Sequence, residues 1–288
     1  MSAGRRRSEL SIVIPMFDEA EVLGDSLASL GSAIDLRRCE LVLVDDGSRD
    51  ATHAVACSIV AELPAARVLR HDRNRGKGAA VRTGVLATTR PYVAFMDADM
   101  STSLDDLDRF LDDLDRVDIV IGSRAVAGAA VRGSSALRVT MGRSFNVLMR
   151  RVVGIPVMDS QCGFKLFRGE VARTLFGLTE CDRYAFDPEV LRLARLLGYT
   201  MLERPVDWTA GSRSAVRPVR DSARTGADLL RVRWSTRRSR LERRLVAPIP
   251  PAPGRAMTID AAAPMVRPAV ADVDALIPPI TGAETSPT

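Results

Sequence analysis

Short apolar runs alternate with longer amphipathic segments from residue 10 to residue 124. The first run, LSIVIP at 10–15, is continuous and ends in proline, as expected of a buried parallel strand. Behind it, Leu23, Leu27 and Leu30 recur at the spacing of one helix face. The alternation predicts strands over 10–15, 40–46, 66–72, 92–99 and 118–124, and helices over about 23–34, 50–61, 76–89 and 103–115.

Strands that alternate with helices of this length through short loops are typical of an α/β fold. We therefore expect a mostly parallel, Rossmann-like sheet with helices on both faces. In such a sheet the carboxyl ends of the strands share one edge, and ligands bind beyond that edge. Many polar residues of the predicted loops fall there: Asp18, Glu19, Asp45, Asp46, Asp72 to Lys77, Asp97, Asp99 and Arg124.

The regular alternation of strands and helices loosens after residue 125. The later part predicts a helix over about 138–151, a strand at GFKLF (163–167), helices over about 169–176 and 187–197, and a strand at TMLERPVDW (200–208). The organisation that we expect is an N-terminal tail (1–9), a main domain (10–212), a basic helical segment (213–245) and a Pro- and Ala-rich tail (246–288). The last tail lacks apolar periodicity, which predicts disorder.

The composition favours a reduced, cytoplasmic protein. The 288 residues are 46% hydrophobic, enough to bury a proper core. The four cysteines are scattered without CxxC pairs, so they indicate neither a zinc site nor a disulfide framework. The longest apolar stretch, FNVLMRRVVGIPVM (145–158), carries Arg150 and Arg151 at its middle and is too short to span a bilayer.

Positive charge is concentrated near the end of the chain and is almost all arginine. The formal net charge is +5, and Lys77 and Lys165 are the only lysines. Between Arg213 and Arg244 there are eleven arginines and three acidic residues, a local net charge of +8. Such a block suits nucleic acid, phosphates or anionic lipid headgroups.

The sequence DAD at 97–99 ends the predicted fourth strand. In an extended chain Asp97 and Asp99 point to the same side, where two carboxylates hold Mg²⁺ or Mn²⁺ and leave positions free for phosphate oxygens. The alternative is a pair of carboxylates that cap the next helix. Taken alone, the motif does not separate these two readings.

Two further strand ends carry candidate binding residues. In VDDGSRD (44–50), Asp46 is placed to accept hydrogen bonds from a ribose or a base edge, whereas Asp50 reads as a helix cap. In NRGKG (74–78), a glycine-rich turn, Lys77 and a helix N-terminus together favour an anion. Neither GxxxxGK[ST] nor GxGxxG follows the first strand, which argues against a P-loop ATPase and a dinucleotide-binding dehydrogenase.

These motifs, in this order, resemble the family 2 glycosyltransferases with the GT-A fold. The resemblance is carried by SIVIPMFDEAEVL, LVLVDDGSRDAT, NRGKGAAVRTGV, VAFMDAD and IVIGSR. Three later segments are similar to the dolichyl-phosphate glucosyltransferase and mannosyltransferase branch, and nearer to the glucosyl one: DSQCGFKLFR, RYAFDPEVLRLARLLGY and RPVDWTAGSRS. The resemblance covers residues 10 to about 235.

The resemblance implies transfer of a hexose, with inversion, from a nucleotide sugar to a polyprenyl or dolichyl phosphate. UDP-glucose is the favoured donor and GDP-mannose the next. On the donor side, the resemblance implies that the base and ribose are bound by Pro15, Phe17, Glu19 and Asp46. It implies that Lys77 and Asp97 also bind the nucleotide sugar, and that Asp97 and Asp99 hold Mg²⁺ or Mn²⁺. Arg213 is expected to close over the phosphates. Ser101 stands where relatives carry a glutamine ligand, so no third protein ligand is implied.

On the acceptor side the resemblance implies that Arg124 and Arg138 bind phosphate groups and serve catalysis electrostatically. Ser212, on the same loop as Arg213, and Lys165 are expected to face the acceptor. A phosphate acceptor needs little deprotonation, so a general base is optional. Asp187 is a candidate for that role, and its alternative is a helix N-terminal acid.

An enzyme that acts on a long isoprenoid must reach a membrane. We therefore expect a peripheral protein on the inner face, with the basic 213–245 segment at an anionic membrane surface. One alternative is a related transferase with a soluble acceptor, such as a phosphoglycerate or a sugar. The other is a nucleic-acid-binding module. Specific nucleic-acid binding is not expected, because Trp234 is the only aromatic residue in the arginine block.

Overall fold

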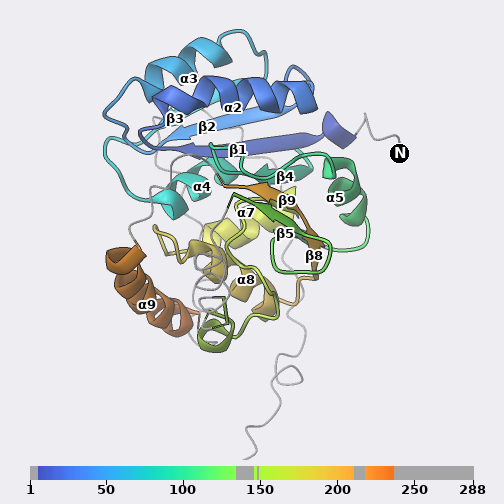
Figure 1. Ribbon diagram of the computed structural model, residues 1–288, viewed down its shortest axis with the longest axis vertical. Coiled ribbons are helices and arrows are strands. Elements are labelled where there is room, and N and C mark those ends of the chain that lie inside the picture. The colour runs from blue at the N-terminus through green and yellow to red at the C-terminus, as the bar shows by residue number, and fades with distance from the viewer. Residues whose placement is uncertain (1–5, 134–145, 148, 211–217, 237–288) are drawn as a thin grey trace, which may run out of the picture.

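The structure is a computed structural model that describes residues 6–133, 146–147, 149–210 and 218–236 (Figure 1). Its elements, in chain order, are β1 (Leu10–Met16), α2 (Ala20–Ala33), β2 (Glu40–Asp45), α3 (Thr52–Val60), β3 (Ala66–Arg70), α4 (Lys77–Leu86), β4 (Tyr92–Phe95), α5 (Leu107–Asp113), β5 (Ile119–Ser123), β6 (Ala130–Arg132), the π-helix η1 (Arg150–Gly154), β7 (Lys165–Arg168), α7 (Gly169–Leu178), α8 (Phe186–Leu196), β8 (Met201–Pro205), β9 (Asp207–Thr209) and α9 (Pro218–Ser235).

A seven-stranded, mostly parallel sheet forms the centre of the fold. Its order is β3-β2-β1-β4-β7-β5-β8, and β7 alone runs antiparallel to its neighbours. β1 and β2 are buried along their whole length, as their continuous apolar runs predict. β2 lies on one side of β1 and β4 lies on the other, so the strand order reverses at β1. Sheets of α/β proteins bind ligands at such a reversal point.

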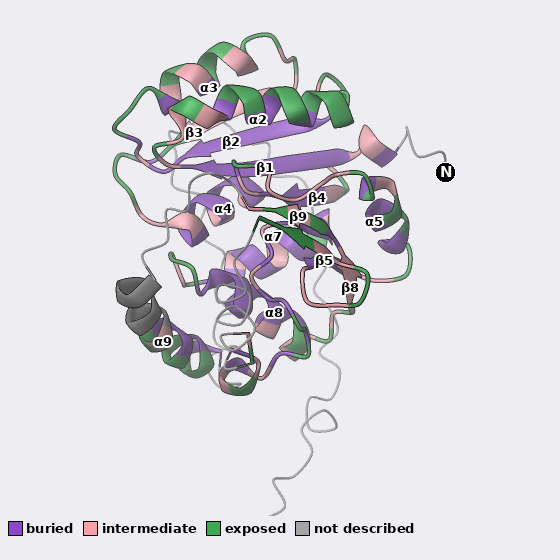
Figure 2. Cartoon of the chain, viewed as in Figure 1, coloured by how far each residue is buried: buried purple, intermediate pink, exposed green. Residues whose placement is uncertain are grey.

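Helices cover both faces of the sheet, as predicted (Figure 1). Because successive side chains of a strand point to opposite faces, Ile12 and Ile14 join one core and Val13 joins the other. The first core contains the apolar faces of α2 and α5, and the second contains those of α4, α7 and α8. Figure 2 shows the buried sheet between helices whose outer sides are exposed.

The antiparallel strand β7 brings a distant segment to the ligand-binding edge. Phe95, the last residue of β4, pairs with Lys165, the first residue of β7, and Ile121 of β5 pairs with the same lysine. The beginning of β7 therefore lies at the edge where β4 and β5 end. As a result, the segment just before β7 meets the DAD sequence.

The predicted strand over 200–208 is two strands in different sheets. β8 extends the main sheet beside β5, whereas β9 pairs in parallel with β6, a strand that the sequence pattern did not predict. Thr102 forms an isolated bridge with Trp208, and the Thr209 amide donates to the Ser101 carbonyl at 2.8 Å. The residues just after DAD are thus fixed against β9.

Two predicted boundaries were wrong. The predicted strand over 92–99 ends at Phe95, so Asp97 and Asp99 lie in a loop and turn, not on an extended chain; the next residue, Met100, has a positive φ of 47°. The predicted helix over 103–115 begins only at Leu107, because the chain before it pairs with β9.

Other expectations concern the ends and one internal segment. Residues 246–288 and most of the expected 138–151 helix lie outside the described residues, and α9 falls within the expected basic helical segment. Arg6 and Arg7, from the expected N-terminal tail, contact the sheet domain through Asp115 and Asp108. In the described part of the chain, no helix is both long and apolar enough to cross a membrane.

Gly84 sets how closely α4 approaches the sheet. A Cβ atom there would lie 2.9 Å from Val44 Cγ2 and closer still to Val13. We expect Gly84→Ala to lower the free energy of unfolding by about 1–3 kcal/mol, because overpacking outweighs the better helix propensity of alanine. Urea unfolding measures this change.

Gly24 of α2 is the matched control, since a Cβ atom there meets nothing within 4 Å. Gly24→Ala is expected to stabilise the protein by about 0.5–1 kcal/mol. Equal effects of the two substitutions would contradict the proposed packing of α4.

Candidate active site

Lys77 and Asp97 form an ion pair at the edge where β1 and β4 end. The Lys77 Nζ lies 2.5 Å from Asp97 Oδ1, and the side chains are 23% and 37% exposed. Burial would lower the pKa of Lys77, but the Asp97 and Asp187 carboxylates outweigh it and raise that pKa. Burial would raise the pKa of Asp97, but Lys77, Lys165 and Arg124 hold it below its usual value. Both groups therefore carry full charge at neutral pH, and both side chains remain partly exposed.

Asp99 is exposed, and its Oδ1 accepts a hydrogen bond of 3.0 Å from the Ser101 amide. The Ser101 hydroxyl is buried and lacks a hydrogen-bond partner in the described part of the chain. Asp97 and Asp99 offer only carboxylate oxygens, the donors that Mg²⁺ and Mn²⁺ prefer. The described residues contain no group of three or more His, Cys, Asp or Glu side chains suited to a metal. The donor set therefore fits an ion that takes its remaining ligands from phosphate and water.

A second ion pair, Lys165 and Asp187, is buried at the start of β7 and α8. Lys165 Nζ donates to Asp187 Oδ1 at 2.6 Å and to the Cys162 carbonyl at 2.7 Å, and it lies 5.0 Å from the centre of the Phe95 ring. The two side chains are only 1% and 6% exposed. Burial raises the pKa of Asp187, and Lys165 opposes this shift.

This pairing bears on two expectations from the sequence. Lys165 was expected to face the acceptor, and Asp187 was a candidate base. The structure gives each of them the other as a buried partner, so neither expected role gains support from the geometry. We interpret Lys165 and Asp187 as an internal support for the more exposed Lys77 and Asp97, to which they are electrostatically coupled.

Gly163 allows the backbone before β7 to pass directly against the Asp97 carboxylate. A Cβ atom at this position would lie 2.7 Å from Asp97 Oδ1 and closer still to Oδ2. Any side chain here would displace the Asp97 carboxylate from its present position. The sequence singled out the surrounding motif DSQCGFKLFR, but the resemblance gave Gly163 no role.

Asp46 organises the NRGKG turn. Its carboxylate accepts hydrogen bonds from the amides of Arg75 (3.0 Å) and Gly76 (2.7 Å), and its Oδ1 lies 2.6 Å from His71 Nδ1. The other imidazole nitrogen of His71 lies 2.9 Å from the Thr83 hydroxyl in α4. Asp46 is 2% exposed, so in this structure it fixes the turn that carries Lys77. Its expected contact with ribose or base stays a prediction.

Gly76 is a position of this turn that only glycine suits. Its φ is +114°, and a Cβ atom would overlap with the Asp182 carbonyl. The α4 N-terminus is thereby held against the loop that leads into α8.

The other residues expected to bind the nucleotide follow β1. Pro15 is buried in that strand, and Phe17 and Glu19 are partly exposed in the loop after it. The Glu19 amide donates to the Thr52 hydroxyl at 2.8 Å, which joins this loop to the start of α3. Asp50 accepts hydrogen bonds from the Thr52 amide (2.9 Å) and the Ala20 amide (3.1 Å) and so joins the first residues of α3 and α2. The N-cap of α3 is Ala51, so the reading of Asp50 as the cap of this helix was wrong by one residue.

Arg124, just beyond β5, is held in place by Asp159. The arginine donates from Nε (2.7 Å) and Nη2 (3.0 Å) to the two carboxylate oxygens, and its amide donates to the same side chain at 3.0 Å. Its guanidinium lies 5.6 Å from the centre of the Trp208 ring. Burial would raise the pKa of Asp159, but Arg124 holds it below its usual value. A guanidinium fixed in this way and 29% exposed is preorganised for a phosphate.

The structure therefore brings Lys77 and Asp97 together, two residues before Asp99, and it gives Arg124 a fixed orientation. Arg138, Ser212 and Arg213 lie outside the described residues, so their expected roles stay predictions. The sequence did not single out Asp159 and Gly163, which contact the candidate site residues Arg124 and Asp97. Both lie in or next to the DSQCGFKLFR motif, but only the fold shows which strand end that motif meets.

Comparison with known proteins identifies relatives over most of the chain. Residues 11–176 match the model of glycosyl transferase family 2. A dolichyl-phosphate beta-glucosyltransferase from Dictyostelium discoideum is 33% identical over 78% of this chain and 74% of the relative. A protein of the same name from Homo sapiens is 31% identical over 81% of this chain and 78% of the relative.

Solved structures confirm the GT-A-like α/β fold. A mannosyltransferase from Pyrobaculum calidifontis in complex with GDP-Man and Mn²⁺ has a TM-score of 0.56 and 20% identity over 85% of this chain and 66% of that chain. The glucosyl-3-phosphoglycerate synthase from Mycobacterium tuberculosis in complex with Mn²⁺, UDP-glucose and phosphoglyceric acid has a TM-score of 0.59 and 19% identity over 82% of this chain and 83% of that chain. The family match, the relatives and the fold agree with the resemblance seen in the motifs: this chain belongs to glycosyl transferase family 2.

Proposed function

We propose that the protein is an inverting transferase that moves glucose from a nucleotide sugar, with UDP-glucose as the favoured donor, to a polyprenyl or dolichyl phosphate. The observation that carries the proposal is the ion pair of Lys77 with Asp97, two residues before Asp99, at the strand ends of a family 2 fold. The names of the relatives favour glucose over mannose and a lipid phosphate over a soluble acceptor. The fold neighbour that acts with phosphoglyceric acid is only 19% identical and supports the fold alone.

On the donor side, opposite charges surround the position proposed for the diphosphate. Asp97 and Asp99 would hold Mg²⁺ or Mn²⁺, and the ion would neutralise charge on the departing nucleoside diphosphate. Lys77 stands at the N-terminus of α4, where its ammonium and the helix dipole both favour phosphate oxygens. Asp97 holds Lys77 in position until a nucleotide sugar competes for the ammonium.

On the acceptor side, Arg124 would bind the lipid phosphate, and Asp159 would set the direction of its guanidinium. A phosphate oxygen is already nucleophilic, so attack on the anomeric carbon opposite the leaving diphosphate needs no general base. The burial of Asp187 is consistent with this scheme. Arg138, Ser212 and Arg213 are proposed to complete the phosphate contacts.

A lipid acceptor also places the protein at a membrane. We propose that it lies on the inner face as a peripheral protein, with the basic segment toward anionic headgroups. Membership of an enzyme family leaves the nucleic-acid-binding alternative without support.

The proposal is tested by incubating the full-length protein with UDP-glucose or GDP-mannose, polyprenyl phosphate and Mg²⁺ or Mn²⁺, and separating the glycolipid. We expect a glucosyl lipid from UDP-glucose, and its loss when the metal is chelated. Product only with phosphoglycerate or a free sugar would establish the soluble-acceptor alternative.

Asp99→Asn should lower the rate of glucose transfer about 100-fold or more. Asp25→Asn is the control, because Asp25 is an exposed acid of α2, and it should leave the rate unchanged.

Gly163→Ala should displace Asp97 while the sheet stays intact, because the overlap is with the end of a side chain. We expect the turnover rate to fall at least about 10-fold, the effect of about 1.4 kcal/mol in the barrier, and the metal concentration for half-maximal rate to rise. Gly31→Ala is the control, since its nearest atom would be an ordinary 3.6 Å away. If the substitution acts through Asp97, the double variant with Asp97→Asn is no slower than Asp97→Asn alone.

Lys165→Met should destabilise the protein by about 3–5 kcal/mol, because it leaves the Asp187 carboxylate buried without a partner. Lys165→Met/Asp187→Leu should recover most of that loss, since both charges are then absent. Arg132→Met is the matched control in an exposed pair, 68% and 47% exposed at 3.4 Å, and should cost about 1 kcal/mol or less. Urea unfolding checks all three, and a double variant as unstable as Lys165→Met would count against the buried pair.

A further inference from the structure

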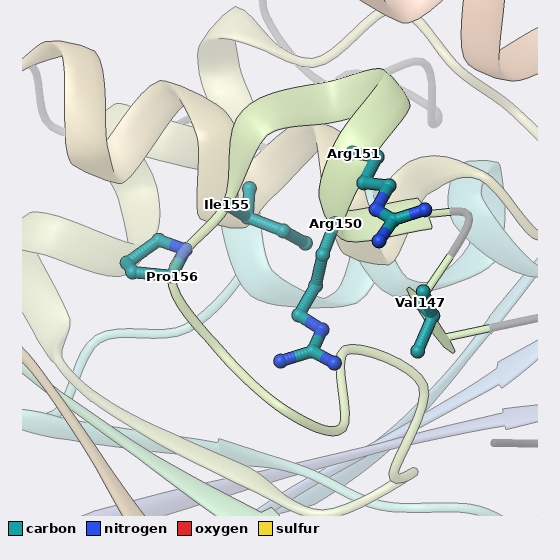
Figure 3. Close-up of a pocket in the computed structure, with 5 residues that line it drawn as sticks. All are labelled: Val147, Arg150, Arg151, Ile155 and Pro156. Atoms are coloured by element: carbon teal, nitrogen blue, oxygen red, sulfur yellow. The ribbon is translucent and has the colours of Figure 1, made fainter. Parts of the chain in front are cut away.

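The apolar stretch with arginines at its middle has no role in the proposed chemistry. Its described part forms η1 and the chain on either side of it, and it lines a cavity of about 490 Å³. Figure 3 shows Arg150 and Arg151 leaving η1, with Val147 on one side and Ile155 and Pro156 on the other. Arg150 Nε is buried and has no hydrogen-bond partner among the described residues.

Exposed apolar side chains gather on this segment and on α9, which packs against η1. In the part of the chain that the structure describes, only six large hydrophobic side chains are exposed, and four of them belong here: Val147 (36%), Met158 (43%), Leu230 (63%) and Trp234 (48%). Leu230 and Trp234 are four residues apart and therefore share one face of α9. Figure 2 shows the exposed side of the described end of α9.

Positive charge surrounds these apolar side chains. Three carbonyls at the end of η1 accept hydrogen bonds from arginines of α8 and α9: Val152 from Arg233 at 2.8 Å, Val153 from Arg192 and Gly154 from Arg195. Burial lowers the pKa of Arg192, and the neighbouring charges of Arg233 and Arg195 lower it further. Residues 146–158 include no acidic residue. Like charges this close favour an anionic partner.

We propose that η1, its flanking residues and the exposed face of α9 form a docking face for an anionic phospholipid bilayer. Arg150 and Arg151 take lipid phosphates at the cavity, and Val147, Met158, Leu230 and Trp234 enter the interfacial layer. Apolar side chains among arginines suit a lipid interface better than a nucleic acid, which offers phosphates without an apolar layer. The inference rests on the proposed lipid acceptor, and it names the surface that reaches the membrane.

The docking face adjoins the acceptor side of the active site through the chain itself. Met158 is followed directly by Asp159, the residue that orients Arg124. Glu203 of β8 accepts hydrogen bonds from the amides of both residues, at 2.7 Å and 3.0 Å, and so fixes this junction. A polyprenyl phosphate whose phosphate group reaches Arg124 would therefore have its isoprenoid chain close to the bilayer that the docking face contacts.

The test is co-sedimentation of the full-length protein with vesicles of phosphatidylcholine alone or mixed with phosphatidylglycerol. We expect binding to the anionic vesicles only. Arg150→Glu/Arg151→Glu should weaken it at least about 10-fold, because each arginine near such a surface contributes about 1 kcal/mol. Arg37→Glu/Arg38→Glu is the matched control, an exposed arginine pair between α2 and β2, and should bind within about 2-fold of wild type.

Two further measurements separate this inference from the proposed function. Leu230→Ser/Trp234→Ser should also weaken vesicle binding, while circular dichroism shows an unchanged fold. Glucose transfer to a short, water-soluble polyprenyl phosphate should be unchanged in the Arg150→Glu/Arg151→Glu variant. Equal vesicle binding by this variant and wild type would overturn the docking face even if transfer occurs, whereas absence of transfer with every acceptor would overturn only the proposed function.

Discussion

Four alternating charges at one edge of the sheet constrain the rest of the site. Asp97, Lys77, Asp187 and Lys165 come from four separate segments, and each is electrostatically coupled to members of the opposite sign. Lys165 and Asp187 are buried, and a buried charge is tolerated only with a partner, so the start of β7 and the start of α8 are held together. The antiparallel strand β7 is what makes this possible, because it delivers Lys165 and Gly163 to the end of β4.

The position of each charge determines its use. Lys77 and Asp97 remain partly exposed, as the proposed exchange of partners with an incoming phosphate or metal requires, whereas Lys165 and Asp187 are buried. Arg124 follows a different principle: its bidentate bond to Asp159 fixes direction but leaves part of the guanidinium accessible. The site thus combines one partly exposed ion pair with one buried ion pair and one guanidinium of fixed orientation.

Much of this arrangement followed from the sequence, because the periodicity of apolar residues is a local property. The strands β1, β2, β3 and β5 and the helices α2, α3, α4, α7 and α8 lie where the pattern predicted them. The early end of β4 and the division between β8 and β9 did not follow, since both depend on pairing with distant segments. The bond between Arg124 and Asp159 and the overlap at Gly163 likewise depend on which strand lies next to which, and no spacing in the sequence encodes that neighbour.

The use of lysine has a chemical consequence of its own. Lys77 and Lys165 carry the only side-chain amines, because the other basic residues are arginines and two histidines. The Lys165 side chain is 1% exposed, and the Lys77 side chain is 23% exposed and paired with Asp97. Guanidinium groups do not react with the usual amine-directed acylating reagents. The folded protein therefore offers such reagents little besides its amino terminus and Lys77, and the acylation rate of that one lysine reports whether its ion pair is closed.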